Sequence, residues 1–343
     1  MDVKVWVTYR CNLACKYCYE SQNKEKLDMS LETAKKTVRF ILKQFEKIQN
    51  ISDQKLRVIF HGGEPLLNYP IITYITHELK NSIPNNTSLL FGTTTNGLIQ
   101  TNEIIAFLCS NMDKLSVSID GNSYTHDKYR CFHDGKGSHS YAMQFLMKSL
   151  EIRNDICARM TYRSDTVSEL FSNVSFLYEK GVKVFDPEPD YGDQNWSEAD
   201  VIILKNEMKK LKQLMDKDNN VKIIPLLNMD RHIILGKCDG GITSFNIMPN
   251  GDIYPCTYIV KNPEFKCGDI NTGIKQNIIN RIDGMSKIDN CECIGCTHRK
   301  SCLSNRCKLM NIAYTGYENQ PSAVFCAIEK VMMYIDMLKT EEW

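Results

Sequence analysis

The sequence lacks an excess of charge of either sign, and it lacks a long apolar run. Its 42 Lys and Arg residues against 41 Asp and Glu residues leave a formal charge of +1. That balance excludes a general attraction to nucleic acid or to an anionic membrane. No apolar stretch approaches the length of a membrane span, and no signal peptide precedes the apolar stretch Val3–Val7. These absences predict a cytoplasmic protein that binds neither nucleic acid nor membrane.

Cysteine, by contrast, is abundant and unevenly placed. The chain has 15 cysteines, and an odd number in a reducing compartment argues against a disulfide framework. Three lie within the first 18 residues, and nine lie between Cys238 and Cys326. Cys109, Cys131 and Cys157 stand singly between these two groups. Clustering at both ends predicts metal sites at both ends.

The first group is a triplet directly after the apolar stretch. Cys11, Cys15 and Cys18 have the spacing C-x3-C-x2-C. A tetrahedral iron or zinc site takes four ligands, and this loop offers three. If the loop holds a [4Fe–4S] cluster, one iron has no protein ligand and can bind another molecule. A zinc knuckle is the alternative, because its short cysteine spacings overlap with this one.

Apolar periodicity predicts alternating strands and helices over the first two hundred residues. Strands are expected near 3–7, 55–60, 89–94, 114–119, 156–162 and 182–185, and helices near 31–48, 71–79, 104–108, 141–152, 167–180 and 201–215. This alternation predicts right-handed βαβ units and a parallel sheet. Six units fall short of a closed eight-fold barrel, so the expected fold class is α/β, a partial (β/α)6 TIM-like barrel.

Polar or glycine-rich clusters follow four successive predicted strands. They are the cysteine triplet and the segments 61–65, 95–97 and 118–121. In this architecture the chemistry lies at the carboxyl ends of the strands, and glycine lets the backbone approach a ligand closely. Each later cluster taken alone reads as a turn. Four in succession predict a ligand site, in which Glu64 could receive an ammonium group.

On these motifs, residues 1 to about 216 resemble a radical S-adenosylmethionine (SAM) barrel. The resemblance implies that Cys11, Cys15 and Cys18 hold the catalytic, SAM-binding [4Fe–4S] cluster. It implies that SAM is bound by Tyr17 beside the adenine, by Gly62, Gly63, Glu64 and Pro65 at the amino group, and by Thr95, Asn96, Ser118 and Asp120 near the ribose and carboxylate. Arg159 is expected either to meet the SAM carboxylate or to form a simple salt bridge.

The last third carries a second cysteine field. Residues 245–256 read as a β-hairpin, because Asn250-Gly251 is a strong turn signal. Cys238 precedes the hairpin and Cys256 ends it; C-x2-C-x5-C-x4-C follows, and a last cysteine lies near the start of a predicted helix, giving Cys293, Cys296, Cys302, Cys307 and Cys326. Seven cysteines can hold two clusters. Zinc ribbons are the alternative, since they share C-x2-C.

The whole pattern resembles the SPASM domain, which carries two auxiliary [4Fe–4S] clusters. The resemblance implies an outer cluster on Cys293, Cys296, Cys302 and Cys326 and an inner one on Cys238, Cys256 and Cys307. The spacing before Cys307 is one residue longer than the family pattern. His232 stands where fully ligated members have another cysteine, so either it is a ligand or, as we favour, the inner cluster keeps an open iron for a substrate thiolate. The expected cofactors are SAM and three [4Fe–4S] clusters.

The predicted organisation is a barrel over 1–216, a linker over 217–237 and a SPASM domain over 238–343. The resemblance implies a maturase that forms an oxidative thioether or carbon–carbon cross-link in a ribosomally made peptide. An anaerobic sulfatase-maturating enzyme is the alternative, disfavoured because Thr257 stands where that family has an Asp base. A non-catalytic, zinc-stabilised binding protein is a further alternative. So is a ferredoxin-like electron carrier, which would leave the segment 62–65 unexplained.

The expected partners follow from that function. They are a peptide or protein substrate and an electron donor such as flavodoxin or ferredoxin. Many such maturases begin with a leader-peptide-binding domain, whereas this sequence begins at the first predicted strand. Leader recognition is therefore expected from a separate protein, from the SPASM region, or not to be needed.

Overall fold

One sheet of eleven strands organises the molecule. The computed structural model describes residues 1–20, 26–48, 55–84, 87–227, 238–260 and 262–338. The strand order is β11-β10-β9-β8-β1-β2-β3-β4-β5-β6-β7. Neighbours from β1 to β7 all pair in parallel; these strands are β1 (Asp2–Thr8), β2 (Lys55–Gly62), β3 (Ser88–Thr95), β4 (Lys114–Ser118), β5 (Cys157–Tyr162), β6 (Val184–Pro189) and β7 (Lys222–Ile223).

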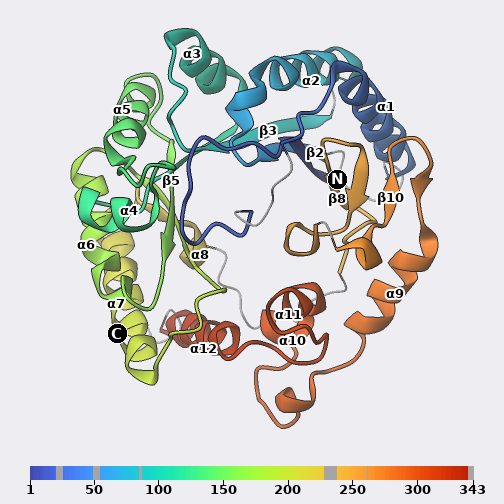
Figure 1. The fold of residues 1–343 in the computed structure, drawn as a ribbon. Coiled ribbons are helices and arrows are strands. Elements are labelled where there is room, and N and C mark those ends of the chain that lie inside the picture. Colours follow the sequence, from blue (N-terminus) through green and yellow to red (C-terminus); the bar gives the residue numbers. More distant parts are fainter. Residues whose placement is uncertain (21–25, 49–54, 85–86, 228–237, 261, 339–343) are drawn as a thin grey trace.

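Helices alternate with these strands, and the longer ones cover the outer side of the sheet (Figure 1). They are α1 (Leu31–Ile48), α2 (Tyr69–Ser82), α3 (Asn102–Asn111), α4 (Ser123–Tyr129), α5 (His139–Leu150), α6 (Leu170–Glu179), α7 (Glu198–Lys217) and the short α8 (Ile224–Leu227). The predicted α/β partial barrel is confirmed. The sequence pattern missed α4 and the two-residue strand β7, because both are too short to show a period.

The alternation of β1 explains how the barrel wall forms. Val3, Val5 and Val7 are buried in the main apolar core. Lys4 and Trp6 point to the other face, where Trp6 packs in a separate buried cluster with Met248. Successive side chains of this strand therefore point alternately into the core beneath the helices and into the barrel interior.

The C-terminal hairpin extends the barrel sheet. The expected hairpin is present as β8 (Ser244–Ile247) and β9 (Asp252–Tyr254), and β8 pairs in parallel with the free edge of β1. The short strands β10 (Gly268–Asp269) and β11 (Gly273–Ile274) follow. Because the sheet runs without a break from β1 to β8, the C-terminal third is built onto the barrel. The division at 216 and 238 stays a prediction.

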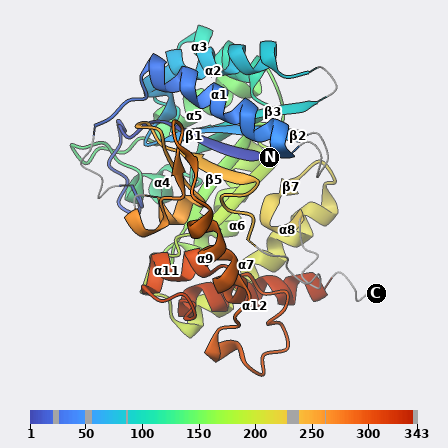
Figure 2. The same cartoon turned by 90° about the vertical axis from the view of Figure 1, so that its right-hand side faces the viewer.

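The remaining helices close the ring below the hairpin (Figure 1). They are α9 (Gln276–Ser286), α10 (Leu303–Arg306), α11 (Lys308–Thr315) and α12 (Ala323–Met337), and α12 packs against α7. Figure 2 shows α12 at the opposite end of the molecule from α1, α2 and α3. Within the described residues, no helix has both the length and the apolar character of a membrane span.

Candidate functional site

The cysteine triplet forms a loop at the carboxyl end of β1. Burial, followed by the charges of Glu64, Cys15 and Cys18, raises the pKa of the Cys11 thiol to about 12. Burial raises the pKa of Cys15 to about 11. The Leu13 N–H donates to Cys11 Sγ at 3.5 Å, and Asn96 Nδ2 lies 3.9 Å from the same sulfur. Donors aimed at a sulfur suit a metal-bound thiolate, because they stabilise its negative charge.

Gly62, which ends β2, and Gly63, which follows it, let the next loop pack against the cysteine loop. The Gly63 N–H donates to Thr8 O at 3.2 Å, and the Glu64 N–H donates to Arg10 O at 2.8 Å. A Cβ at Gly63 would lie 2.4 Å from Arg10 O, which is too close for any side chain. The close approach that glycine permits here is therefore to the chain's own cysteine loop.

Glu64 links the ends of β2 and β3. Its buried carboxylate accepts hydrogen bonds from Leu66 N–H (3.1 Å), from the Thr95 hydroxyl (2.8 Å) and from Asn96 N–H (2.8 Å). Burial nevertheless outweighs these donors and raises the pKa of Glu64 to about 7. A carboxylate has about four acceptor positions, so one remains for another donor. Its contact with the SAM amino group stays a prediction.

Asp120 is fully engaged by protein donors. Its carboxylate accepts from Arg130 Nε (2.9 Å) and Nη2 (3.0 Å), from the Tyr17 hydroxyl (2.5 Å) and from Thr161 N–H (2.8 Å). The Arg130 and Asp120 side chains are only 9% and 2% exposed. Arg130 also lies over the Tyr17 ring, 5.2 Å from its centroid. The sequence pattern missed Arg130, which directly follows α4.

The other predicted SAM contacts fall on neighbouring strand ends. Ser118 is half-buried at the end of β4, and Pro65 begins a buried turn directly after Glu64. Arg159 on β5 forms an ion pair with Asp186 on β6, the simpler of its two expected roles. The structure thus brings the triplet together with the segments 62–65 and 95–96, and it ties Tyr17 to Asp120. Their contacts with SAM stay predictions.

The barrel interior carries polar groups that the sequence pattern did not single out. Lys4 Nζ donates to the Thr257 hydroxyl at 2.7 Å, and that hydroxyl donates to Asn246 Oδ1 at 3.1 Å. Burial lowers the pKa of Lys4, although the nearby Cys256 opposes the shift. These contacts join β1 to the segment after β9. The signal was weak, because a lone lysine in an apolar strand has no motif around it.

His61 lies in the same interior, on β2. Burial, with the charges of Lys4 and Arg159, lowers the pKa of His61 to about 3, so the imidazole is neutral at physiological pH. Its Nδ1 accepts the Gly62 N–H at 2.8 Å, which assigns the ring proton to Nε2. That nitrogen lies 3.2 Å from the Tyr19 hydroxyl, beside the cysteine loop.

The C-terminal cysteines fall into two groups. Besides burial, the charges of Cys256 and Cys238 raise the pKa of Cys307 to about 12. In the second group, burial is the main cause of the raised pKa of the Cys293 thiol. The charges of the other thiols in this group also raise it; they belong to Cys302, Cys326 and Cys296. These are the two groups expected for the inner and outer clusters. His232 lies outside the described residues.

Ligand spacing distinguishes a cluster from a single ion. Four thiolates on one zinc lie about 2.3 Å from the metal and hence about 3.8 Å from one another. Among the described residues, no three His, Cys, Asp or Glu side chains converge closely enough to hold one metal ion. The thiols in each group are nonetheless near enough to shift one another's pKa. This looser spacing fits a multi-iron cluster. The assignment of each thiol as a ligand stays a prediction.

The cysteines outside the three groups have separate surroundings. Cys267 is fully buried, with its Sγ 3.4 Å from Ile253 O, and Cys109 and Cys157 are also buried. Cys131 lies against the triplet loop, where its Sγ is 3.5 Å from Ala14 O. Cys291 is exposed. Packing therefore accounts for Cys109, Cys157 and Cys267, whereas the buried Cys131 is the one that also contacts the triplet loop.

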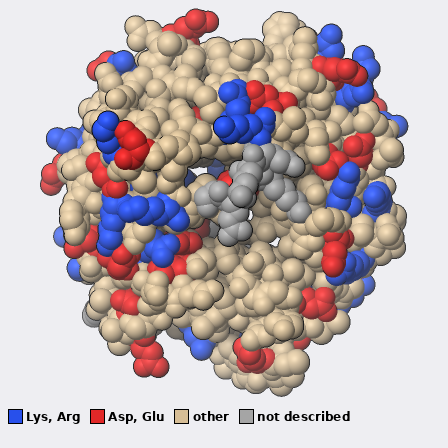
Figure 3. All heavy atoms as spheres, viewed as in Figure 1, with Lys and Arg blue, Asp and Glu red and all other residues tan. Residues whose placement is uncertain are grey.

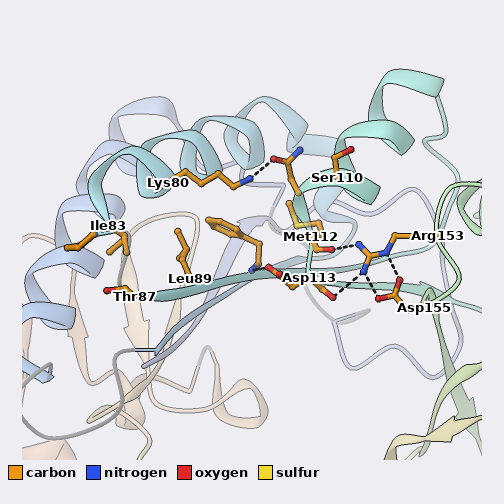
Figure 4. Close-up of a pocket in the computed structure, with 12 residues that line it drawn as sticks. Lys80, Ile83, Thr87, Leu89, Ser110, Met112, Asp113, Arg153 and Asp155 are labelled. Atoms are coloured by element: carbon orange, nitrogen blue, oxygen red, sulfur yellow. Dashed lines mark hydrogen bonds and ion pairs between the residues drawn. The ribbon is translucent and has the colours of Figure 1, made fainter. Parts of the chain in front are cut away.

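A pocket of about 600 Å³ lies at the amino ends of β3 and β4, away from this site (Figure 4). Arg153 crosses it, donating to Met112 O at 2.6 Å and pairing with Asp155 at 2.5 Å. Lys80 Nζ donates to Asn111 Oδ1 at 2.7 Å. The charged side chains that line the pocket are all engaged in hydrogen bonds or ion pairs, whereas the buried Thr87 hydroxyl has no partner among the described residues. This end of a barrel serves stability rather than chemistry.

A family model decides the identity of the barrel. The model described as "Radical SAM superfamily" matches residues 6–186, more than half of the chain. The chain belongs to the radical SAM superfamily. Membership implies SAM and a [4Fe–4S] cluster, and the triplet that follows β1 lies inside the matched region.

Curated relatives agree with that family. The chain is 34% identical over 180 residues to an uncharacterized protein of Methanocaldococcus jannaschii, covering 52% of this chain and 58% of that protein. It is 24% identical to the cysteine-type anaerobic sulfatase-maturating enzyme of Clostridium novyi, covering 76% and 74%. It is 23% identical to the subtilosin biosynthesis protein AlbA of Bacillus subtilis, covering 80% and 58%. The match thus spans little more than half the length of two of these relatives.

Solved radical SAM structures share the whole fold. The structure of anSMEcpe with bound AdoMet and a peptide superposes with a TM-score of 0.81 at 17% identity, covering 98% of this chain and 97% of that one. Streptococcus suis SuiB bound to its precursor peptide SuiA gives 0.67 at 16% identity, covering 95% and 75%. The C-terminal third is included in both matches, so the predicted barrel with a cysteine-rich C-terminal domain is confirmed as a fold.

Proposed function

We propose that this protein is a radical SAM peptide maturase that forms an oxidative cross-link, a thioether or a carbon–carbon bond, in a ribosomally made peptide. The observation that carries the proposal is the segregation of ten cysteines into three separate thiol groups within one family fold. One group lies at the barrel mouth, as SAM cleavage requires. The cysteines of the other two belong to the C-terminal region between Cys238 and Cys326, whose elements complete the ring (Figure 1).

The residues present fit the groups that this chemistry needs. When bound, [4Fe–4S] clusters would supply the electron that cleaves SAM and an acceptor for the electron that the peptide gives up. Cys11, Cys15 and Cys18 would hold the first cluster, and the two C-terminal groups the other two. Asn96 and Leu13 would stabilise the charge on the Cys11 sulfur. Glu64 would offer its remaining acceptor position to the SAM amino group.

The cross-link reaction balances on the peptide itself. A C–H bond and an S–H bond, or two C–H bonds, break as the new bond forms, so the peptide loses two hydrogens. One hydrogen atom leaves with the 5′-deoxyadenosyl group, and the second leaves as a proton and an electron. The role of the chain's own residues is to position SAM and the peptide so that only the chosen C–H lies within reach.

Formylglycine formation is the second candidate function. The sulfatase-maturating relative spans 76% of this chain, and the anSMEcpe fold spans 98% of it. That reaction needs a base near the substrate. Thr257 cannot serve as one at neutral pH, but Lys4, whose pKa is lowered by burial, lies 2.7 Å from the Thr257 hydroxyl. Lys4 is thus the observation in favour of this alternative.

Product analysis separates the two reactions. Anaerobically reconstituted enzyme with SAM and reductant should form 5′-deoxyadenosine, and a cysteine-containing candidate peptide should then lose two hydrogens by mass. A thioether would also protect that cysteine from iodoacetamide. An aldehyde that reacts with a hydrazine would identify formylglycine and overturn the cross-link proposal.

Metal analysis tests the non-catalytic alternatives. Three clusters require about twelve irons and as many sulfides per chain. Zinc without visible absorbance would indicate a structural scaffold. Iron–sulfur absorbance without any SAM cleavage would indicate an electron carrier.

A further inference from the structure

A groove on the outer side of the barrel is separate from the barrel interior. It encloses about 850 Å³ between α1 on one side and the turn after β10, β11 and the start of α9 on the other. Figure 1 shows α1 and β10 as neighbours on the outer rim. Neither the thiol groups nor the predicted SAM contacts line this groove. It is therefore a separate surface that the proposed chemistry does not explain.

The positive charge that lines the groove comes entirely from one helix, α1, in the part of the chain that the structure describes. Helix α1 lines it with Lys36, Arg39, Lys43 and Lys47, which share one face through spacings of three and four residues. No Asp or Glu is among the described residues that line it. Glu32 pairs with Lys36 at 3.0 Å, while Lys43 and Lys47 form no ion pair with a described residue. In a chain of net charge +1, this is a local cationic surface.

The opposite wall carries apolar side chains beside the polar Asn271, Thr272 and Gln276, and it includes a sheet edge. Ile242 contributes a side chain that is 49% exposed, and Ile274 lies on β11. Strand β11 is the last of the sheet order, so among the described residues its outer edge has no strand partner. A free strand edge beside apolar side chains favours an extended peptide, because such a peptide supplies both backbone groups and alternating side chains.

We infer that this groove binds an acidic, extended segment of the peptide substrate, outside the residues that are modified. Acidic side chains would face α1, and apolar side chains of the same segment would face Ile242 and Ile274. The identification of that segment with the substrate rests on the proposed function, whereas the binding does not require SAM cleavage. A concave surface that combines lysine and arginine side chains with isoleucines and a strand edge fits a peptide better than a nucleic acid duplex or the convex surface of a flavodoxin.

Binding is tested directly on the full chain with its clusters reconstituted. The probe is a fluorescein-labelled peptide of twelve residues that alternates Glu and Val, and fluorescence anisotropy measures its affinity at low and at moderate salt. We expect binding that weakens as salt rises. A matching Lys–Val peptide should not bind.

Charge reversal on α1 locates the binding site. The double variant Arg39→Glu/Lys43→Glu should weaken the Glu–Val peptide about tenfold or more, since each exposed ion pair contributes up to about 1 kcal/mol. Lys35→Glu is the matched control, because Lys35 is exposed on the same helix but does not line the groove. Its affinity should stay within about twofold of the parent. All these side chains are exposed or half-buried, and iron content checks that each variant is loaded equally.

The outcomes separate this inference from the proposed function. If the double variant and Lys35→Glu bind the peptide equally well, the groove is not the binding site and the inference is overturned. The inference is also overturned if the Glu–Val peptide does not bind at all. Tighter binding of a DNA duplex or of flavodoxin, lost in the same double variant, also overturns it. If 5′-deoxyadenosine forms normally but the peptide does not bind, the inference about the groove fails and the proposed function stands. Peptide binding at the groove by an enzyme that oxidises no peptide overturns the proposed function alone.

Discussion

The two cysteine-rich regions differ in what holds them in place. The N-terminal triplet is fixed by buried side chains at the ends of neighbouring strands, chiefly Glu64 and the Asp120–Arg130 ion pair. Three cysteines of the outer C-terminal group, Cys293, Cys296 and Cys302, lie on loops and short turns, and Cys326 lies on α12. There the support comes from side chains such as Asn305, which accepts from Asn290 N–H at 2.8 Å, and Glu329, which accepts from Leu303 N–H at 2.9 Å.

This difference indicates a division of labour. A site built on strand ends keeps its geometry without metal, because the sheet determines it. A site built on loops gains much of its order from the metal that its thiols bind. The N-terminal site is therefore suited to repeated chemistry on a bound ligand, and the C-terminal groups are suited to fixed cofactors. The following substitutions test that contrast.

The largest effect is expected at the triplet. Cys15→Ala should reduce 5′-deoxyadenosine formation by about a thousandfold or more, because loss of a ligand removes the group that cleaves SAM. Anaerobic assays by liquid chromatography measure it, with iron falling by about four per chain. Cys109→Ala is the control, since Cys109 is buried in the apolar core and belongs to no thiol group. Full SAM cleavage by Cys15→Ala would remove the triplet from the mechanism.

The next largest effect is expected at Glu64. Glu64→Gln replaces one acceptor oxygen by a donor NH2, which opposes the Asn96 N–H or the Thr95 hydroxyl. We expect SAM affinity to fall about tenfold to a hundredfold, since leaving a buried donor unpaired costs about 1–3 kcal/mol. Equilibrium dialysis with radiolabelled SAM measures it. Unchanged affinity would show that the carboxylate supports neither the loop nor the ligand.

The pH dependence of folding checks the same carboxyl group. Because burial raises the pKa of Glu64 from 4.5 to about 7, the folded state holds its proton more tightly than the unfolded state. Its contribution to the free energy of unfolding is therefore present below pH 4.5 and is lost as pH rises to about 7. The free energy of unfolding, measured by urea titration at several pH values in this range, should fall more steeply with pH for the parent than for Glu64→Gln. Parallel curves would contradict the raised pKa.

Local patterns predicted the fold well, while the assignment of thiols to clusters stays a prediction. Metal-ligand spacings and the 2.0 and 3.6 residue periods are properties of short segments, so the triplet, the hairpin and α1 could be read directly. At the start of α1, for example, Ser30 Oγ accepts the Thr33 N–H at 3.0 Å. The parallel pairing of β8 with β1 could not be read, because neither strand contains a signal for its partner.

Contacts between distant segments were the part that escaped prediction. The Lys4–Thr257 hydrogen bond joins residues 253 positions apart, and the Glu64–Thr95 bond spans 31. Arg130 looked like one charge in a loop, yet it forms the buried partner of Asp120. A sequence shows which residue types carry chemistry. It does not show which of them neutralise one another after folding.

A smaller effect on SAM cleavage is expected from the inner C-terminal group. Cys307→Ala should lower iron from about twelve to about eight per chain while 5′-deoxyadenosine formation stays within about threefold. Peptide cross-linking should be lost, because the electron from the peptide has no acceptor. The parallel variant Cys326→Ala shows whether the outer group behaves alike. Loss of SAM cleavage in Cys307→Ala would mean that the two regions are not independent.

The smallest effect is expected at Thr257, where the two regions meet. Thr257→Val keeps the shape of the side chain but removes the hydroxyl that accepts from Lys4 and donates to Asn246. We expect a loss of about 1–3 kcal/mol in the free energy of unfolding, since the Lys4 ammonium loses its acceptor. SAM cleavage without peptide should be unchanged, because Thr257 contacts neither the triplet loop nor Glu64 in the described residues. Denaturant titration and the 5′-deoxyadenosine assay measure the two quantities on one preparation. A tenfold fall in cleavage would show that Lys4 transmits the state of the hairpin to the SAM site, and the strand-end site would then not be self-sufficient.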